Sequence, residues 1–112
     1  MAKALLLAKK AASADEVPVG AVAVQDGRII AGACNRTIKE NDPTAHAEII
    51  VLRKAAKILK NYRLNGVTIY ATKEPCVMCA GAMVSARIRK IVFGCYDKTS
   101  GACGSVFNVA DN

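Results

Sequence analysis

The sequence contains no tryptophan, and aromatic residues make up only 4% of its 112 residues. The hydrophobic core must therefore be built from the Ala, Val, Ile and Leu residues that dominate its 53% hydrophobic content. Acidic residues are also scarce, nine against 16 lysines and arginines, so the net charge is +7. A small basic protein commonly binds an anionic partner, most often a nucleic acid, although a merely basic protein is the simpler alternative.

Long hydrophobic runs are absent as well. No run approaches the roughly 18 consecutive apolar residues of a membrane-spanning helix. The N-terminal segment is basic and apolar, but Lys3, Lys9 and Lys10 interrupt any signal-peptide core. We therefore expect neither a secreted nor a membrane protein, and we assign the chain to the cytoplasm. Its five cysteines then indicate metal binding or core packing rather than a disulfide framework.

The length suits one domain, and we assign residues 1–112 to it. Apolar residues follow helical spacing in some segments and form short Val- and Ile-rich runs in others. In order, these patterns predict a helix at 2–12, strands at 17–24 and 28–35, a helix from 42–43 to 60, a strand at 67–72, a helix at 75–87 and a strand at 91–94.

This order predicts an α/β layered fold around a mixed sheet. The pair Asp26-Gly27 favours a tight turn, so the first two strands should form a hairpin. The last two strands flank a helix, which is typical of a right-handed crossover between parallel strands. Asp42 is a good helix N-cap and Pro43 suits the first helical position, so the second helix should begin there.

Three residues form a candidate metal site. Cys76 and Cys79 lie three apart at the start of a predicted helix, so their side chains share one face. The positive end of the helix favours thiolates, the form of cysteine that binds metal. With His46, the only histidine, they make a Cys₂His set, which is typical of a zinc centre with an open fourth position for water. Soft thiolates favour zinc over magnesium or calcium.

Glu48 is the candidate general base, because it lies about 200° around a regular helix from His46 and so suits proton transfer better than metal binding. Each pattern alone has a plain alternative: a lone histidine is often a surface residue, and a C-x-x-C pair also serves redox chemistry or no chemistry. Together, H-x-E followed by P-C-x-x-C is the signature of zinc nucleobase deaminases.

The other three cysteines match no position of this signature. Cys103 is an alternative fourth ligand of a closed structural zinc site, and we interpret Cys34 and Cys95 as core residues.

Further motifs extend the signature along the chain. They are EVPVGA at 16–21, DPTAHAE at 42–48, NYRL at 61–64, EPCVMCAGAM at 74–83, and VFG at 92–94 with Asp97 and Gly104-Ser105. On these motifs the sequence resembles the bacterial tRNA-specific adenosine deaminases, from about Ala4 to Asp111. The NYRL tract, with the long motif that follows it, favours this branch over free-base guanine or cytosine deaminases.

The resemblance implies a three-layer α/β/α cytidine-deaminase-like fold and a homodimer. It implies hydrolytic deamination of the wobble adenosine of tRNA to inosine. The partner would be the tRNA anticodon loop, and the cofactor one Zn²⁺ per chain. Carried over by position, the resemblance assigns His46, Cys76 and Cys79 to the metal and Glu48 to the proton shuttle. It assigns Asn35 and the Ala47 backbone to the base, and Asp97 to the ribose of the target nucleotide. Val17 and Pro18 would form part of the pocket wall, and Asn61 would lie close to the pocket.

Two features depart from the family pattern. Lys73 stands where relatives usually carry an apolar residue, and it either shifts substrate choice or points to solvent. The chain ends at Asn112, where relatives continue, so we expect their C-terminal strand and helix to be missing and a sheet edge to be exposed. A fragment, a naturally short relative and an engineered minimal deaminase are all compatible with this length.

Other substrates therefore remain open: adenine or cytosine in single-stranded DNA, or a free nucleobase. An alternative of another class is a non-catalytic, zinc-stabilised RNA-binding module. Glu48 argues against that module, because a structural zinc site needs no general base.

Overall fold

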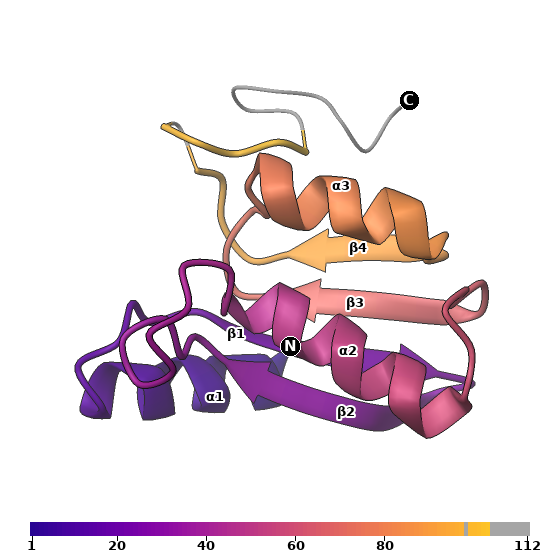
Figure 1. Cartoon of the computed structure of the whole chain (residues 1–112), viewed down its shortest axis with the longest axis horizontal. Helices are drawn as coiled ribbons and strands as arrows, with labels where there is room; N and C mark the ends of the chain where they lie inside the picture. The colour runs from indigo at the N-terminus through magenta and orange to yellow at the C-terminus, as the bar shows by residue number, and fades with distance from the viewer. Residues whose placement is uncertain (98, 104–112) are drawn as a thin grey trace.

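The computed structural model of the protein describes residues 1–97 and 99–103; the last family motif, Gly104-Ser105, lies outside the described residues. None of the helices in the described part is long and apolar enough to cross a membrane. The elements follow one another as α1 (Ala2–Ser13), β1 (Gly20–Gln25), β2 (Arg28–Cys34), α2 (Ala47–Leu59), β3 (Val67–Ala71), α3 (Val77–Ala86) and β4 (Lys90–Phe93) (Figure 1).

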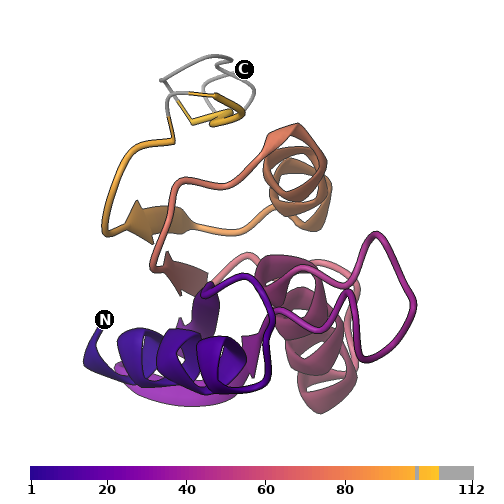
Figure 2. The same ribbon diagram turned by 90° about the vertical axis from the view of Figure 1, so that its left-hand side faces the viewer.

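The strands form one mixed sheet in the order β2-β1-β3-β4. β1 pairs antiparallel with both β2 and β3, whereas β3 and β4 are parallel. α1 lies on one face of the sheet, and α2 and α3 lie side by side on the other (Figure 2). The predicted three-layer fold around a mixed sheet is therefore confirmed, and β4 forms one edge of the sheet in the part of the chain described.

The core is made of small aliphatic side chains between the sheet and the layer of α2 and α3. Val51, Ile69 and Met83 are fully buried there, one each from α2, β3 and α3. Burial of such a side chain contributes about 1.5–3 kcal/mol to stability, so this packing fixes the two helices against the sheet. The core, which contains no tryptophan, is thus held together by many contacts between aliphatic side chains.

On the other face, α1 approaches the sheet very closely. Its buried residues are alanines at helical spacing, and Gly20 of β1 lies against the helix backbone. A Cβ atom added at Gly20 would lie 2.1 Å from the carbonyl oxygen of Ala4. Small residues on both sides therefore allow the close approach, and β1 is buried on both faces, as its valine-rich pattern predicts.

The predicted start of the second helix at Asp42-Pro43 is wrong, because α2 begins at Ala47. Asp42 closes a turn instead: its Oδ1 accepts hydrogen bonds from the Thr44 backbone N–H at 2.8 Å and the Thr44 hydroxyl at 2.7 Å. His46 is extended, with φ −72° and ψ 150°, and so stands at the N-cap position. The imidazole therefore precedes the helix rather than projecting from its side.

The third helix also begins later than its sequence pattern predicts. Cys76 is extended, with φ −75° and ψ 177°, and occupies the N-cap position of α3, which begins at Val77. The first strand likewise begins at Gly20 rather than at Val17. These shifts place irregular backbone beside the starts of both helices, where the candidate site lies.

Candidate active site

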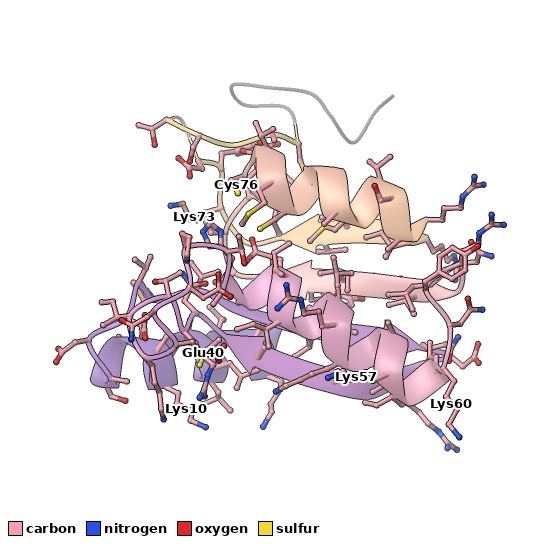
Figure 3. The ribbon with its side chains drawn as sticks, in the orientation of Figure 1. Lys10, Glu40, Lys57, Lys60, Lys73 and Cys76 are labelled. Atoms are coloured by element: carbon pink, nitrogen blue, oxygen red, sulfur yellow. The ribbon has the colours of Figure 1, made fainter. Side chains whose placement is uncertain are left out.

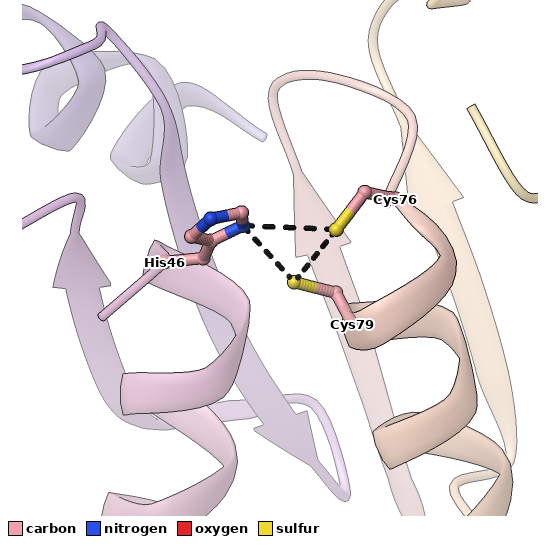
Figure 4. A group of neighbouring side chains, drawn as sticks. All are labelled: His46, Cys76 and Cys79. Atoms are coloured by element: carbon pink, nitrogen blue, oxygen red, sulfur yellow. Dashed lines mark hydrogen bonds between the residues drawn. The ribbon is translucent and has the colours of Figure 1, made fainter. Parts of the chain in front are cut away.

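Three potential metal ligands meet where α2 and α3 begin. The Nδ1 atom of His46 lies 3.7 Å from the Cys76 Sγ and 3.5 Å from the Cys79 Sγ, and the two sulfurs are 3.7 Å apart (Figure 4). His46 and Cys76 come from the N-cap positions of the two helices, and Cys79 lies one turn into α3. Segments 30 residues apart in the sequence thus supply one compact triangle.

The triangle has the dimensions of a zinc site. A tetrahedral zinc with Zn–S bonds of about 2.3 Å and Zn–N bonds of about 2.0–2.1 Å would separate its sulfurs by about 3.8 Å and nitrogen from sulfur by about 3.6 Å. The observed distances agree with both values. Among the described residues, the group of potential ligands at such distances comprises His46, Cys76 and Cys79, without Cys103. Two thiols and one imidazole thus fit zinc as three ligands, which leaves a fourth position for water.

Burial changes the proton affinities of these ligands. It raises the pKa of the Cys79 thiol, and the neighbouring Glu48 and Cys76 raise it further. Burial also lowers the pKa of His46, and the positive charge of Lys73 lowers it further. His46 is therefore neutral at pH 7, as a metal ligand must be, and a bound cation would stabilise the two thiolates.

Glu48 lies beside the triangle, in the first turn of α2. Its side chain is buried, and together with His46 and Cys76 it lines a cavity of about 170 Å³. Burial raises the pKa of the Glu48 carboxyl. A carboxyl group with a raised pKa takes up and releases protons closer to neutral pH, which is what a general acid and base requires.

The cavity is small and mixed in character. Binding sites for drug-sized ligands enclose about 300–1,000 Å³, so this one suits a single flat base better than a whole nucleotide. The residues that line it are Val17, Val19, Asn35, Thr37, His46, Glu48, Lys73, Glu74, Cys76, Asp97 and Ser100. The structure therefore brings together most of the site residues that the sequence predicts.

Asn35 and Ala47 are bonded to each other. The Asn35 Oδ1 accepts a hydrogen bond from the Ala47 N–H at 2.8 Å, so the asparagine satisfies the first N–H group of α2. The Ala47 N–H is thereby engaged within the protein. The two hydrogens on the Asn35 Nδ2 are the part of this pair that is suited to a ligand in the cavity.

Asp97 is held by its own loop. Its Oδ1 accepts hydrogen bonds from the backbone N–H groups of Thr99 and Ser100 and from the Thr99 hydroxyl, and its Oδ2 accepts one from the Ser100 hydroxyl. Lys73 adds an ion pair, with Nζ 3.1 Å from the Asp97 Oδ2. The hydrogen bonds from Ser100 and Thr99, followed by the one from Lys73, lower the pKa of Asp97 well below its ordinary value.

Glu74 is a buried carboxylate to which the sequence analysis gave no role. Its two oxygens accept hydrogen bonds from the backbone N–H groups of Asp97 at 3.1 Å and Cys103 at 2.8 Å. Cys76 forms a β-bridge with Gly101, where a Cβ atom would lie 2.5 Å from the Glu74 carboxylate. Glu74 thus holds Asp97 and Cys103 close to the segment that carries Cys76. Its place directly before Pro-Cys was the available signal, but its burial was not predictable from that motif.

Some predicted placements differ in the structure. Pro18 is exposed and does not line the cavity, whereas its neighbour Val19 does. Asn61 was expected close to the pocket, but it follows the C-terminal end of α2, while His46 precedes the N-terminal end. A helix of 13 residues separates the two positions by about 20 Å. Cys95 is exposed rather than a core residue, and Cys34 is half-buried.

Comparison with known proteins agrees with the geometry. The family model of the MafB19-like deaminases matches residues 1–110. The tRNA-specific adenosine deaminase of Haemophilus influenzae is 53% identical over 100% of this chain and 65% of its own length. The tRNA-specific adenosine deaminase of Bacillus subtilis is 48% identical over 97% of this chain and 68% of its own length. The chain thus spans about two thirds of the length of these relatives.

Two solved deaminase structures also share the fold of this chain. A structure from studies of A-to-I editing by tRNA:A34 deaminases at the wobble position of transfer RNA superposes with a TM-score of 0.97 and 48% identity, covering 100% of this chain and 81% of that one. The guanine deaminase of Bacillus subtilis superposes with a TM-score of 0.84 and 39% identity, covering 93% of this chain and 67% of that one. By the family model, these identities and the shared fold, the chain belongs to the family of the tRNA-specific adenosine deaminases.

Proposed function

We propose that the chain catalyses the zinc-dependent hydrolytic deamination of adenosine to inosine at the wobble position of tRNA. The observation that carries this proposal is the zinc-sized triangle of His46, Cys76 and Cys79 beside the buried carboxyl group of Glu48. The relatives named as tRNA-specific adenosine deaminases support the choice of substrate. Reduced thiols are typical of the cytoplasm, and we assign the activity to that compartment.

The metal ligands and Glu48 have different roles in the proposed reaction. His46, Cys76 and Cys79 would hold a zinc ion, which would lower the pKa of a bound water molecule to about 7 and so supply a nucleophile at neutral pH. Glu48 takes the proton from the attacking water and passes it to the ring nitrogen beside C6 of adenine. After the water oxygen has bonded to C6, the same carboxylate takes the proton that remains on this oxygen and transfers it to the amino group. The bond between C6 and the amino nitrogen then breaks, ammonia leaves, and C6 becomes the carbonyl carbon of inosine.

Other residues orient the base. The Asn35 Nδ2 donates a hydrogen bond to it, while the Asn35 Oδ1 remains on the Ala47 N–H. Val17 and Val19 provide an apolar wall that excludes water from one side of the cavity. Because the cavity fits one base, the adenosine must be flipped out of its stack, which costs least in an unpaired loop such as an anticodon. The net charge of +7 favours the approach of the phosphate backbone.

The direct test compares the chain with its Glu48→Gln variant on tRNA, using digestion to nucleosides and quantitation of inosine. A lost general acid and base reduces the rate by about a hundred- to ten-thousand-fold. We expect that loss, with one zinc per chain retained in metal analysis. Glu40→Gln is the matched control, because Glu40 is an exposed glutamate whose partner is Arg36. If Glu48→Gln loses zinc together with activity, Glu48 is a ligand and the mechanism is wrong.

The likeness to guanine deaminase makes free-base deamination the second candidate. The same assay, extended to guanine, cytosine, adenine and single-stranded DNA, separates the two candidates. Release of ammonia from a free base without inosine in tRNA would replace the proposed substrate and leave the chemistry intact. Activity on DNA but not on tRNA would do the same.

We also propose that the protein forms a homodimer, as the family resemblance implies. An apolar groove between α2 and α3 supports this, because a second copy would cover it. The groove is lined by Ile49, Leu52, Arg53, Ala56, Tyr62, Leu64, Ala82, Ser85 and Ala86. Sedimentation velocity gives the mass in solution, and a monomer at all concentrations would contradict the proposal.

A further inference from the structure

Lys73 is the one lysine or arginine among the described residues that line the cavity. It lies in the connection between β3 and α3, and its side chain is 43% exposed. Figure 3 shows Lys73 near Cys76 and away from Lys57 and Lys60, which lie lower and farther to the right in this view. It lines the same cavity as His46 and Glu48.

The ion pair with Asp97 does not use the full capacity of this ammonium group. Lys73 has three N–H donors, and one of them suffices for the Asp97 Oδ2. Asp97, in turn, keeps four hydrogen bonds from Thr99 and Ser100 without the lysine. Lys73 can therefore offer donors to a ligand while the loop that carries Asp97 stays in place.

The wall of the cavity otherwise repels anions. Glu48, Glu74 and Asp97 contribute three carboxyl groups, and all three are buried. A nucleotide that inserts its base here leaves its phosphates at the mouth of the cavity, close to these carboxyl groups. A half-exposed cation at that mouth is the group suited to accept the phosphate.

We propose that Lys73 forms a phosphate subsite, in which its ammonium group binds the RNA phosphodiester that adjoins the target adenosine. This inference rests on the proposed function, because it presumes that an adenosine within RNA occupies the cavity. Lys73 is then a positioning residue: it favours an adenosine carried by a polynucleotide over a free base, which has no phosphate to bind.

The test measures binding of a fluorescent, short single-stranded RNA with one adenosine, by anisotropy over a range of salt concentrations, together with kcat and KM for the same RNA. Lys73→Gln removes the charge and Lys73→Arg keeps it. Lys57→Gln is the matched control, since it removes one exposed lysine at the other end of α2. For Lys73→Gln we expect Kd and KM to rise about five- to tenfold, with kcat within about twofold.

The salt dependence of RNA binding shows whether a lost phosphate contact causes the weaker binding of Lys73→Gln. One lost phosphate contact should reduce the slope of log K against log salt by about 0.7, and Lys73→Arg should restore it. An equal loss in Lys57→Gln would overturn the subsite, because the effect would then be one of net charge. A fall in kcat with unchanged binding would overturn it too, because Lys73 would then act only through the loop that carries Asp97. Binding is measurable without turnover, so absence of inosine with the unaltered chain counts against the proposed function alone.

Discussion

The proposed mechanism gives Asn35 two roles, one for each polar atom of its side chain. The Oδ1 atom accepts the Ala47 N–H and so caps α2, and we propose that the Nδ2 atom donates a hydrogen bond to the base. Asn35→Ala leaves a buried N–H group without its acceptor, which should reduce the free energy of unfolding by about 1–2 kcal/mol. Thermal unfolding monitored by circular dichroism measures this loss.

Asn35→Asp separates the two roles. Aspartate keeps an acceptor for the helix N-terminus, so the variant should lose less stability than Asn35→Ala. It lacks the amide hydrogens, so inosine formation should fall as far as in Asn35→Ala. If Asn35→Asp were stable and fully active, the proposed contact between Asn35 and the base would be wrong.

At the residue scale, the sequence predicted what depends on local spacing and missed what depends on long-range contacts. The spacing of Cys76 and Cys79 predicted a shared helix face, and His46 was the only imidazole available. Nothing local indicates that Glu74 accepts N–H groups of residues 23 and 29 positions away. Such contacts follow from the crossover between β3 and β4, after which Gly101 pairs with Cys76 at the start of α3.

At the scale of elements, the helix starts were the least predictable feature. Asp42 and Pro43 have the propensities of a helix start, and Asp42 accepts the Thr44 N–H as an N-cap would, yet α2 begins only at Ala47. The delay has a chemical result, since it leaves His46 in extended backbone opposite Cys76. Propensity predicted that a helix exists there. Where it begins coincides with two long-range hydrogen bonds, from the Arg36 N–H to the Ala45 carbonyl oxygen and from the Ala47 N–H to the Asn35 Oδ1.

Two glycines, one in β1 and one in α3, should respond in opposite ways to substitution by alanine. A Cβ atom at Gly81 in α3 meets no atom within 4 Å, and alanine is the better helix former. Gly81→Ala should therefore stabilise the fold by about 0.5–1 kcal/mol. At Gly20, the added Cβ would meet the Ala4 carbonyl oxygen, so Gly20→Ala should force α1 away from the sheet and destabilise the protein.

Urea unfolding of the two variants measures both effects, and unaltered inosine formation by Gly81→Ala serves as the control for the site. A destabilised Gly81→Ala would contradict the open space beside α3. A Gly20→Ala variant as stable as the unaltered chain would mean that α1 is not held as closely to β1 as the structure describes.

At the scale of the whole molecule, the metal site joins two halves of the fold. His46 comes from the part built on the hairpin of β1 and β2, and Cys76 and Cys79 come from the unit of β3, α3 and β4. An apolar groove runs between α2 and α3. A zinc ion across this junction should therefore contribute to stability as well as to catalysis.

Removal of zinc with a chelator should lower the melting temperature markedly. A ligand present at a thousandfold excess over its Kd stabilises the folded state by about 4 kcal/mol, which for a chain of this size is on the order of 10–20 °C in Tm. Calorimetry before and after chelation, with re-addition of zinc, measures the shift. Cys34→Ala should show the full shift, because Cys34 lies outside the triangle, whereas Cys76→Ser should begin at a lower Tm and respond little to the chelator. If chelation removes the metal and leaves Tm unchanged, packing alone holds the two halves together, and the zinc serves the chemistry only.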